Sequence, residues 1–129
     1  MTLAIEDRVA IHGLLALYGH LIDQGCWDEL DQVFTHDVTY DATDFGHAVT
    51  RTLAELRTHW QDNPSIHPLA HHASNIVVSE EDDGTVRVLS KGIGIGRKGR
   101  VGSVTYHDTV LRTATGWRLA SRRAELRRA

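Results

Sequence analysis

Residues 101–126, VGSVTYHDTVLRTATGWRLASRRAEL, contain two strand-like runs separated by an Ala-Thr-Gly turn signal at residues 114–116. So short a connection predicts that the two strands are antiparallel neighbours. Residues 69–79 and 85–95 have the same character and are followed by turn signals of the same kind. The second half of the chain is therefore expected to form a four-stranded antiparallel meander. Glycines at alternate positions give this sheet a place to bend, namely Gly92, Gly94 and Gly96.

The first half of the chain shows helical periodicity. Residues 4–22 form one amphipathic pattern and residues 27–34 a shorter one. The apolar stripe of the first pattern consists of Ile5, Val9, Gly13, Leu17 and Leu21, widened by Ala10, Leu14 and Ile22. A short strand is expected at residues 38–42, and a capping box of Thr52 and Glu55 begins a third helix. Three helices before a meander predict an α+β fold, with the helices packed against a strongly curved antiparallel sheet.

Length and composition indicate one globular domain over residues 1–129. Apolar residues make up 41% and charged residues 24%, and a formal net charge of −3 argues against binding to nucleic acid or acidic membranes. Cys26 is the one cysteine, and no stretch has the pattern of a leader or a membrane span. We therefore expect a protein of the reducing cytoplasm. The basic C-terminal side chains are expected to be solvated, and they are Arg118, Arg122, Arg123, Arg127 and Arg128.

Asp23 is the first candidate functional residue, because it follows the apolar stripe. An ionised carboxylate near apolar surroundings costs free energy unless it is paired, and histidine is the partner that titrates near neutral pH. His71 shares one face of its predicted strand with Ala73 and Asn75. Small or polar residues on a face that should be apolar indicate the lining of a cavity.

Two segments of the chain form a family-like pattern. The first is Tyr18-x4-Asp23-x3-Trp27-x2-Leu30-x3-Phe34-x2-Asp37, and the second runs from Tyr106-His107-Asp108 through Gly116-Trp117-Arg118-Leu119 to Arg122. Together with the order of elements, from about Leu3 to Leu126, they resemble the SnoaL-like branch of the nuclear-transport-factor-2-like superfamily. This resemblance implies a cone-shaped α+β barrel. The branch includes scytalone dehydratase, bile-acid 7α-dehydratase, hexachlorocyclohexane dehydrochlorinase, polyketide cyclases and small-molecule binders.

The elimination enzymes of this branch use an Asp at the end of the first helix and a His early in the first long strand. The resemblance therefore implies that Asp23 pairs with His71, and Tyr18 matches a tyrosine of the bile-acid dehydratase pattern. Two departures argue against scytalone as the substrate. Ile22 stands where scytalone dehydratase has a tyrosine, and residues 85–95 contain no histidine.

We expect a cofactor-independent lyase of the dehydratase type, or an isomerase, that acts on a hydrophobic cyclic small molecule. His71 would remove a proton from carbon, Asp23 would orient its ring, and Tyr18 would hydrogen-bond the leaving group or an oxyanion. Two alternatives stay open: a polyketide cyclase with Asp23 as the base, and a non-catalytic small-molecule-binding or assembly domain. The further substrate-binding candidates are Tyr40, Trp60, Asn75, Tyr106 and Asp108.

No metal is expected, because adjacent strand residues such as His71 and His72 face opposite sides, and no Glu or Cys at ligand spacing completes a site with His67. Apolar residues on both faces of the last strands, for example Val110 and Leu111, leave an outer face to cover. We therefore expect a homodimer or homotrimer formed through the outer face of the sheet, and neither a nucleic acid nor a membrane as partner.

Overall fold

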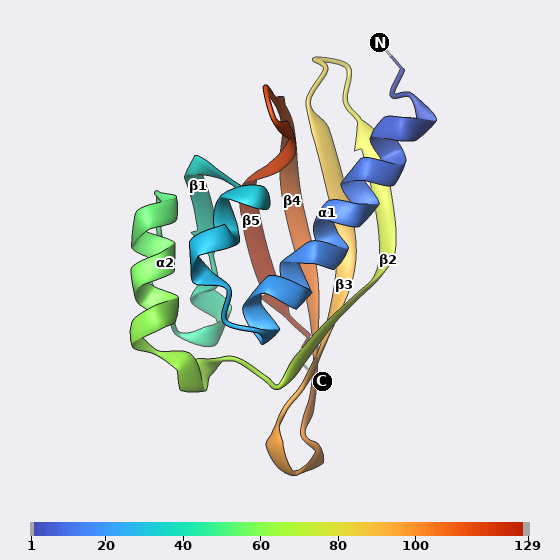
Figure 1. Cartoon of the computed structure of the whole chain (residues 1–129). Helices are drawn as coiled ribbons and strands as arrows, with labels where there is room; N and C mark the ends of the chain where they lie inside the picture. The colour runs from blue at the N-terminus through green and yellow to red at the C-terminus, as the bar shows by residue number, and fades with distance from the viewer. Residues whose placement is uncertain (1, 128–129) are drawn as a thin grey trace.

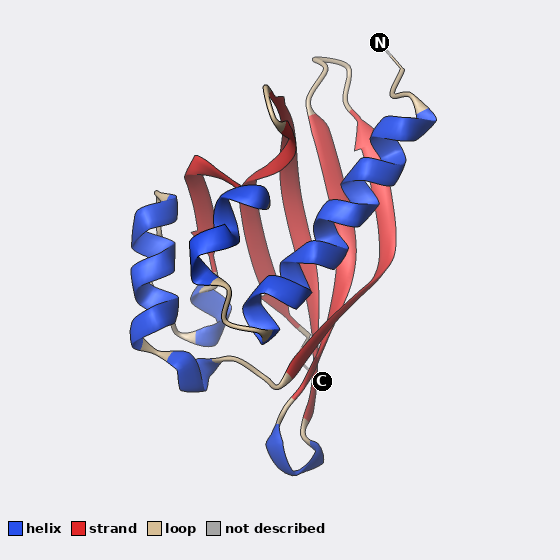
Figure 2. Cartoon of the chain, in the orientation of Figure 1, coloured by secondary structure: helices blue, strands red, loops and turns tan. Residues whose placement is uncertain are grey.

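The computed structural model describes residues 2–127 and has helices on one face of a curled sheet (Figures 1 and 2). The helices are α1 (Ile5–Asp23), α2 (Leu53–Asp62) and four short 3₁₀ helices, η1 (Trp27–Gln32), η2 (Thr43–Phe45), η3 (Pro64–Ile66) and η4 (Arg97–Gly99). The strands are β1 (Phe34–Asp41), β2 (Ala70–Glu80), β3 (Val86–Ile95), β4 (Val101–Thr113) and β5 (Gly116–Leu126). The predicted α+β fold is confirmed, and the core lies between the helices and the sheet.

The five strands lie in the order β1-β5-β4-β3-β2. Strands β2 to β5 form the predicted antiparallel meander, but β1 pairs with β5 in parallel. The expectation of a purely antiparallel sheet is therefore wrong at this edge. No tight turn connects β1 to β5, so nothing local imposes opposite directions on the two strands. The sheet curls without closing, and β1 and β2 are its two edges.

The buried face of α1 differs from the predicted stripe. It consists of Ile11, Leu14, Leu15, Tyr18, Gly19, Leu21 and Ile22. Ile5 and Val9, which were expected in the stripe, are 72% and 66% exposed. In an α-helix each step of four residues moves a side chain roughly 40° around the axis. A stripe with a strict step of four therefore turns away from the sheet toward the start of the helix.

The second and third predicted helices are both present. The second is the 3₁₀ helix η1, and the chain enters β1 at Phe34, earlier than predicted. At the start of α2, the Thr52 hydroxyl accepts a hydrogen bond from the Glu55 amide at 3.1 Å, as predicted. Leu53, Leu56 and Trp60 are buried. None of the described helices is both long and apolar enough to cross a membrane.

Strand β2 contains a bulge that reverses its alternation. The pairing register with β3 shifts between Ser74 and Val77, and Asn75 adopts a left-handed backbone with φ 53°. Beyond the bulge, Ile76 and Val78 pack against the core. The prediction that Asn75 shares the face of His71 is therefore wrong, because one extra residue moves the following side chains to the opposite face.

Candidate functional site

The site begins where α1 crosses β2 at Gly19. A Cβ at Gly19 would lie 3.0 Å from the carbonyl oxygen of His71 and 3.3 Å from its Cβ. Because glycine has no side chain, the helix can approach the strand this closely. Asp23 lies one turn further along the same helix face. The crossing therefore carries the carboxylate of Asp23 to His71.

The carboxylate of Asp23 contacts His71 at two points. Oδ1 lies 2.5 Å from the ring Nδ1, and Oδ2 accepts a hydrogen bond from the backbone N–H of His71 at 3.0 Å. The side chains of His71 and Asp23 are 15% and 22% exposed, and Asp23 ends α1 at a position where the residue as a whole is exposed, so the pair lies at the edge of the core and not deep inside it. Two contacts to one residue restrict the rotation of the ring. With Nδ1 occupied by the carboxylate, Nε2 is the nitrogen left for other chemistry.

His71 lies in the wall of a cavity of about 450 Å³, which is within the size range of small-molecule sites. The wall also includes Tyr106, His67, Phe45, Ile66 and Val104. Two of the predicted bend glycines, Gly94 and Gly96, line this cavity, and the third, Gly92, lies against Tyr106. Gly94 pairs with His71 in the sheet, and a Cβ at Gly92 would lie 2.5 Å from Cε2 of Tyr106. The absence of a side chain at Gly92 therefore lets the ring of Tyr106 lie against β3.

His67 belongs to the cavity wall, although the sequence suggested it only as a metal ligand to be rejected. Its ring centroid lies 5.5 Å from that of Trp27, 5.3 Å from Trp60 and 6.2 Å from His71. Burial, and after it the neighbouring imidazoles of His71 and His59, lower the pKa of His67 to about 4. Its ring is therefore neutral near pH 7. Nε2 of His67 is buried and has no hydrogen-bond partner within residues 2–127.

Tyr18 and Tyr40 form a buried hydroxyl pair with 2.6 Å between their oxygens. Burial, followed by the neighbouring tyrosines, raises the pKa of both phenols, so both remain protonated. The Tyr18 ring meets the His71 ring edge-on with centroids 6.0 Å apart. Tyr18 also lines a second, smaller space of about 20 Å³ together with His71 and Tyr106.

Arg122 lies at the centre of the site, and the prediction that it is solvated is wrong. It was expected in solvent but is only 2% exposed, and its guanidinium donates two hydrogen bonds of 2.8 Å to Asp108. The guanidinium carbon lies 4.3 Å from the centroid of the Tyr18 ring and 3.7 Å from that of Tyr106. Asp108 pairs directly with Arg122 across β4 and β5. The sequence could have indicated this pair, because opposite charges stand at facing positions of two strands that line the core.

The five predicted substrate-binding residues fall into three groups. Tyr106 lines the cavity wall. Tyr40, Trp60 and Asp108 are buried and contact other site residues, with Asp108 held by Arg122. Asn75 is exposed on the bulge of β2, where its side-chain oxygen accepts a hydrogen bond from Ser74. Within the described residues, no group of three His, Cys, Asp or Glu side chains is placed to hold a metal ion.

The family of SnoaL-like domains matches residues 3–123. The chain belongs to the SnoaL-like family. The match spans both the Asp23–His71 crossing and the Asp108–Arg122 pair. No curated protein has a matching sequence.

Several solved structures share the fold. A cystatin-like-fold protein of unknown function from Nostoc punctiforme is 21% identical, with a TM-score of 0.84 and coverage of 100% of this chain and 97% of that chain. An NTF2-like protein with a cystatin-like fold from Novosphingobium aromaticivorans is 27% identical, with a TM-score of 0.69 and coverage of 95% and 82%. A candidate scytalone dehydratase from Novosphingobium aromaticivorans is 18% identical, with a TM-score of 0.74 and coverage of 96% and 86%.

Proposed function

We propose that the protein is a lyase of the dehydratase type, or an isomerase, that acts on a hydrophobic cyclic small molecule by acid/base catalysis. The observation that carries the proposal is the double contact of Asp23 with His71 at the wall of the 450 Å³ cavity. A histidine oriented by a carboxylate and open to a small-molecule cavity is the arrangement that general base catalysis requires.

In the proposed reaction, the Nδ1–H of His71 donates a hydrogen bond to Asp23. The lone pair on Nε2 then accepts a proton from a substrate carbon. The carboxylate of Asp23 stabilises the imidazolium that forms. In a dehydration, the imidazolium then returns the proton to the departing hydroxyl, so the reaction releases water and regenerates neutral His71. An isomerisation differs only in that the proton returns to another carbon. These steps need side-chain proton transfer alone.

The tyrosines supply neutral hydrogen-bond donors in this proposal. Tyr106 lines the cavity, so its hydroxyl is the phenol that we assign to the substrate oxygen. Burial and the neighbouring Tyr18 raise the pKa of Tyr106, which keeps it a donor. The ring of Tyr18 packs in T-shaped contacts against the rings of His71 and Tyr106 and thereby supports both. If Tyr40 is the donor in the Tyr18–Tyr40 pair, the O–H of Tyr18 is free to donate to the leaving group, and this second role of Tyr18 is part of the proposal.

The family supports a small-molecule-processing role, and one structural neighbour is a candidate scytalone dehydratase. Scytalone itself fits poorly, because Ile22 stands in place of a tyrosine and β3 has no histidine. Both carboxylate oxygens of Asp23 are engaged by His71. This engagement favours His71 over Asp23 as the base, and therefore favours elimination or isomerisation over the cyclase mechanism with Asp23 as the base.

The test is proton exchange at carbon, which needs no knowledge of the natural leaving group. The probe is 1-tetralone in D₂O, a bicyclic ketone with exchangeable protons beside its carbonyl, followed by NMR. We expect the wild type to accelerate exchange, and His71→Ala to lose on the order of a hundredfold or more of that acceleration. Asp23→Asn should also lower the rate, because an amide can donate to Nδ1 and shift the ring proton to Nε2.

The matched control is His72→Ala, which removes the exposed neighbour of His71 on the same strand and should leave the exchange rate unchanged. Circular dichroism verifies that each variant is folded. Equal exchange rates for wild type and His71→Ala would contradict the proposal and favour a non-catalytic small-molecule-binding domain.

A further inference from the structure

The cavity extends to a basic hairpin tip. Strands β3 and β4 continue past the rest of the sheet, and their connection projects beyond the helices (the orange hairpin in Figure 1). The turn is closed by a hydrogen bond from the Gly96 amide to the Arg100 carbonyl at 2.7 Å, and Lys98 and Gly99 adopt left-handed backbones with φ 61° and 73°. The two arginines on either side of this turn, Arg97 and Arg100, both line the cavity.

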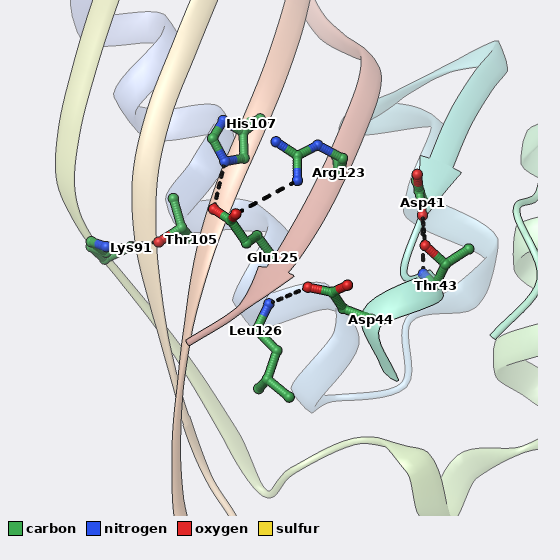
Figure 3. A network of polar contacts seen from close by, with 9 residues as sticks. All are labelled: Asp41, Thr43, Asp44, Lys91, Thr105, His107, Arg123, Glu125 and Leu126. Atoms are coloured by element: carbon green, nitrogen blue, oxygen red, sulfur yellow. Dashed lines mark hydrogen bonds and ion pairs between the residues drawn. The ribbon is translucent and has the colours of Figure 1, made fainter. Parts of the chain in front are cut away.

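The charge of the cavity wall is opposite to that of the chain. The formal net charge is −3, yet Arg97 and Arg100 line the wall and none of the described carboxylates does. Neither arginine forms an ion pair within residues 2–127. Asp44 is adjacent to the lining residue Phe45, but its carboxylate accepts a hydrogen bond from the Leu126 amide at 2.9 Å (Figure 3). The wall of the cavity at the hairpin therefore includes two permanently charged residues, both exposed, and no carboxylate among the described residues.

We propose that the substrate is an amphipathic anion, with its ring system beside His71 and Tyr106 and an oxyanion such as a carboxylate held by Arg97 and Arg100. The position of the reacting ring rests on the function proposed above. A guanidinium is permanently charged and presents a planar fork of donors that matches a carboxylate. The same cavity wall carries apolar side chains, including Phe45, Ile66, Val104 and Leu126. A ligand with an apolar body and one acidic end would match both the apolar and the basic side chains of this wall.

The test uses two fluorescent probes that share an anilinonaphthalene ring system and differ by one sulfonate. 8-Anilinonaphthalene-1-sulfonate is the anion, and N-phenyl-1-naphthylamine is its neutral counterpart. We expect the double variant Arg97→Gln/Arg100→Gln to bind the anion about fivefold more weakly, the size expected for two partly exposed ion pairs. Its affinity for the neutral probe should stay unchanged. Raising the salt concentration should weaken the binding of the anionic probe only.

Two controls make the result specific. Arg87→Gln/Arg123→Gln removes the same charge from the outer face of the sheet, where Arg123 pairs with Glu125 (Figure 3), and should leave both affinities unchanged. Val104→Trp narrows the cavity and should weaken both probes, which places them inside it. An equal effect of the Arg97/Arg100 substitutions on both probes, no effect on either, or anion binding that Val104→Trp does not weaken would each overturn the inference. The assay measures binding and not turnover, so its outcome is independent of whether His71 acts as a base.

Discussion

At the scale of single residues, the pair of Arg122 and Asp108 holds the tyrosines of the site in place. The guanidinium lies between the rings of Tyr18 and Tyr106 and is attracted to the faces of both. Burial alone would lower the pKa of Arg122, but the carboxylate of Asp108 more than compensates, and the pKa is raised well above its usual value. Arg122 therefore remains charged inside the protein, and its charge depends on one partner.

Breaking this pair should cost far more stability than breaking an exposed pair. We predict that Arg122→Met lowers the free energy of unfolding by roughly 3–5 kcal/mol, because it leaves the carboxylate of Asp108 buried without a partner. The measurement is urea denaturation followed by circular dichroism.

The control is Arg112→Met, which removes an ion pair with Asp7 from a side chain that is 60% exposed. It should change stability by about 1 kcal/mol or less. Similar losses in the two variants would show that the buried position of Arg122 carries no special cost.

At the scale of elements, the crossing of α1 and β2 determines the geometry of the Asp23–His71 pair. The two elements touch at Gly19, where the backbone of His71 occupies the space of a side chain. Gly13 lies on the same helix but is exposed, and a Cβ there would meet nothing within 4 Å. Alanine substitutions at the two glycines can therefore be compared. The one at Gly13 measures the helix propensity of alanine alone, and the one at Gly19 adds the effect of the crossing.

We predict that Gly13→Ala raises the free energy of unfolding by roughly 0.5–1 kcal/mol, because alanine is the better helix former. Gly19→Ala should be less stable than Gly13→Ala and should slow the exchange of 1-tetralone, because the helix must move away from His71. Thermal unfolding and the exchange assay measure the two effects. Equal stability and equal exchange rates in both variants would show that the close crossing does not position the pair.

At the scale of the whole molecule, the outer face of the sheet is a candidate interface between copies of the chain. It exposes apolar side chains among polar ones, with Val77 55%, Leu89 46%, Ile93 38% and Leu111 48% exposed. Between them lie polar contacts such as Lys91 with Thr105 and His107 with Glu125 (Figure 3). Val77 and Leu89 are paired neighbours in the sheet, and adjacent exposed apolar side chains mark interaction surfaces more often than scattered single residues do.

We predict that the protein is a homodimer or homotrimer at micromolar concentration, formed through this face. Light scattering coupled to size exclusion measures the mass, and Leu89→Lys should shift it to that of the monomer. Val9→Lys is the control, because Val9 is 66% exposed on α1 and should not affect assembly. A monomer mass for the wild type would contradict the prediction.

The sequence by itself determined the features that depend on neighbouring residues. The four strand-like runs, their turn signals and the Thr52–Glu55 cap are all found in the structure, because each depends on local backbone conformation. The residues alone also marked Asp23 as a carboxylate in need of a partner. Resemblance to the family pointed to His71, and the structure brings the two together across 48 positions of the chain.

Only the tertiary structure decided the features that depend on distant packing. One extra residue at Asn75 reversed the alternation of β2, and β1 took a parallel place beside β5. The burial of Arg122 followed from its position opposite Asp108. The cavity wall likewise combines His67 with the hairpin arginines. Side-chain periodicity determines which residues share one face of a helix or strand. Which other element packs against that face depends on the tertiary structure.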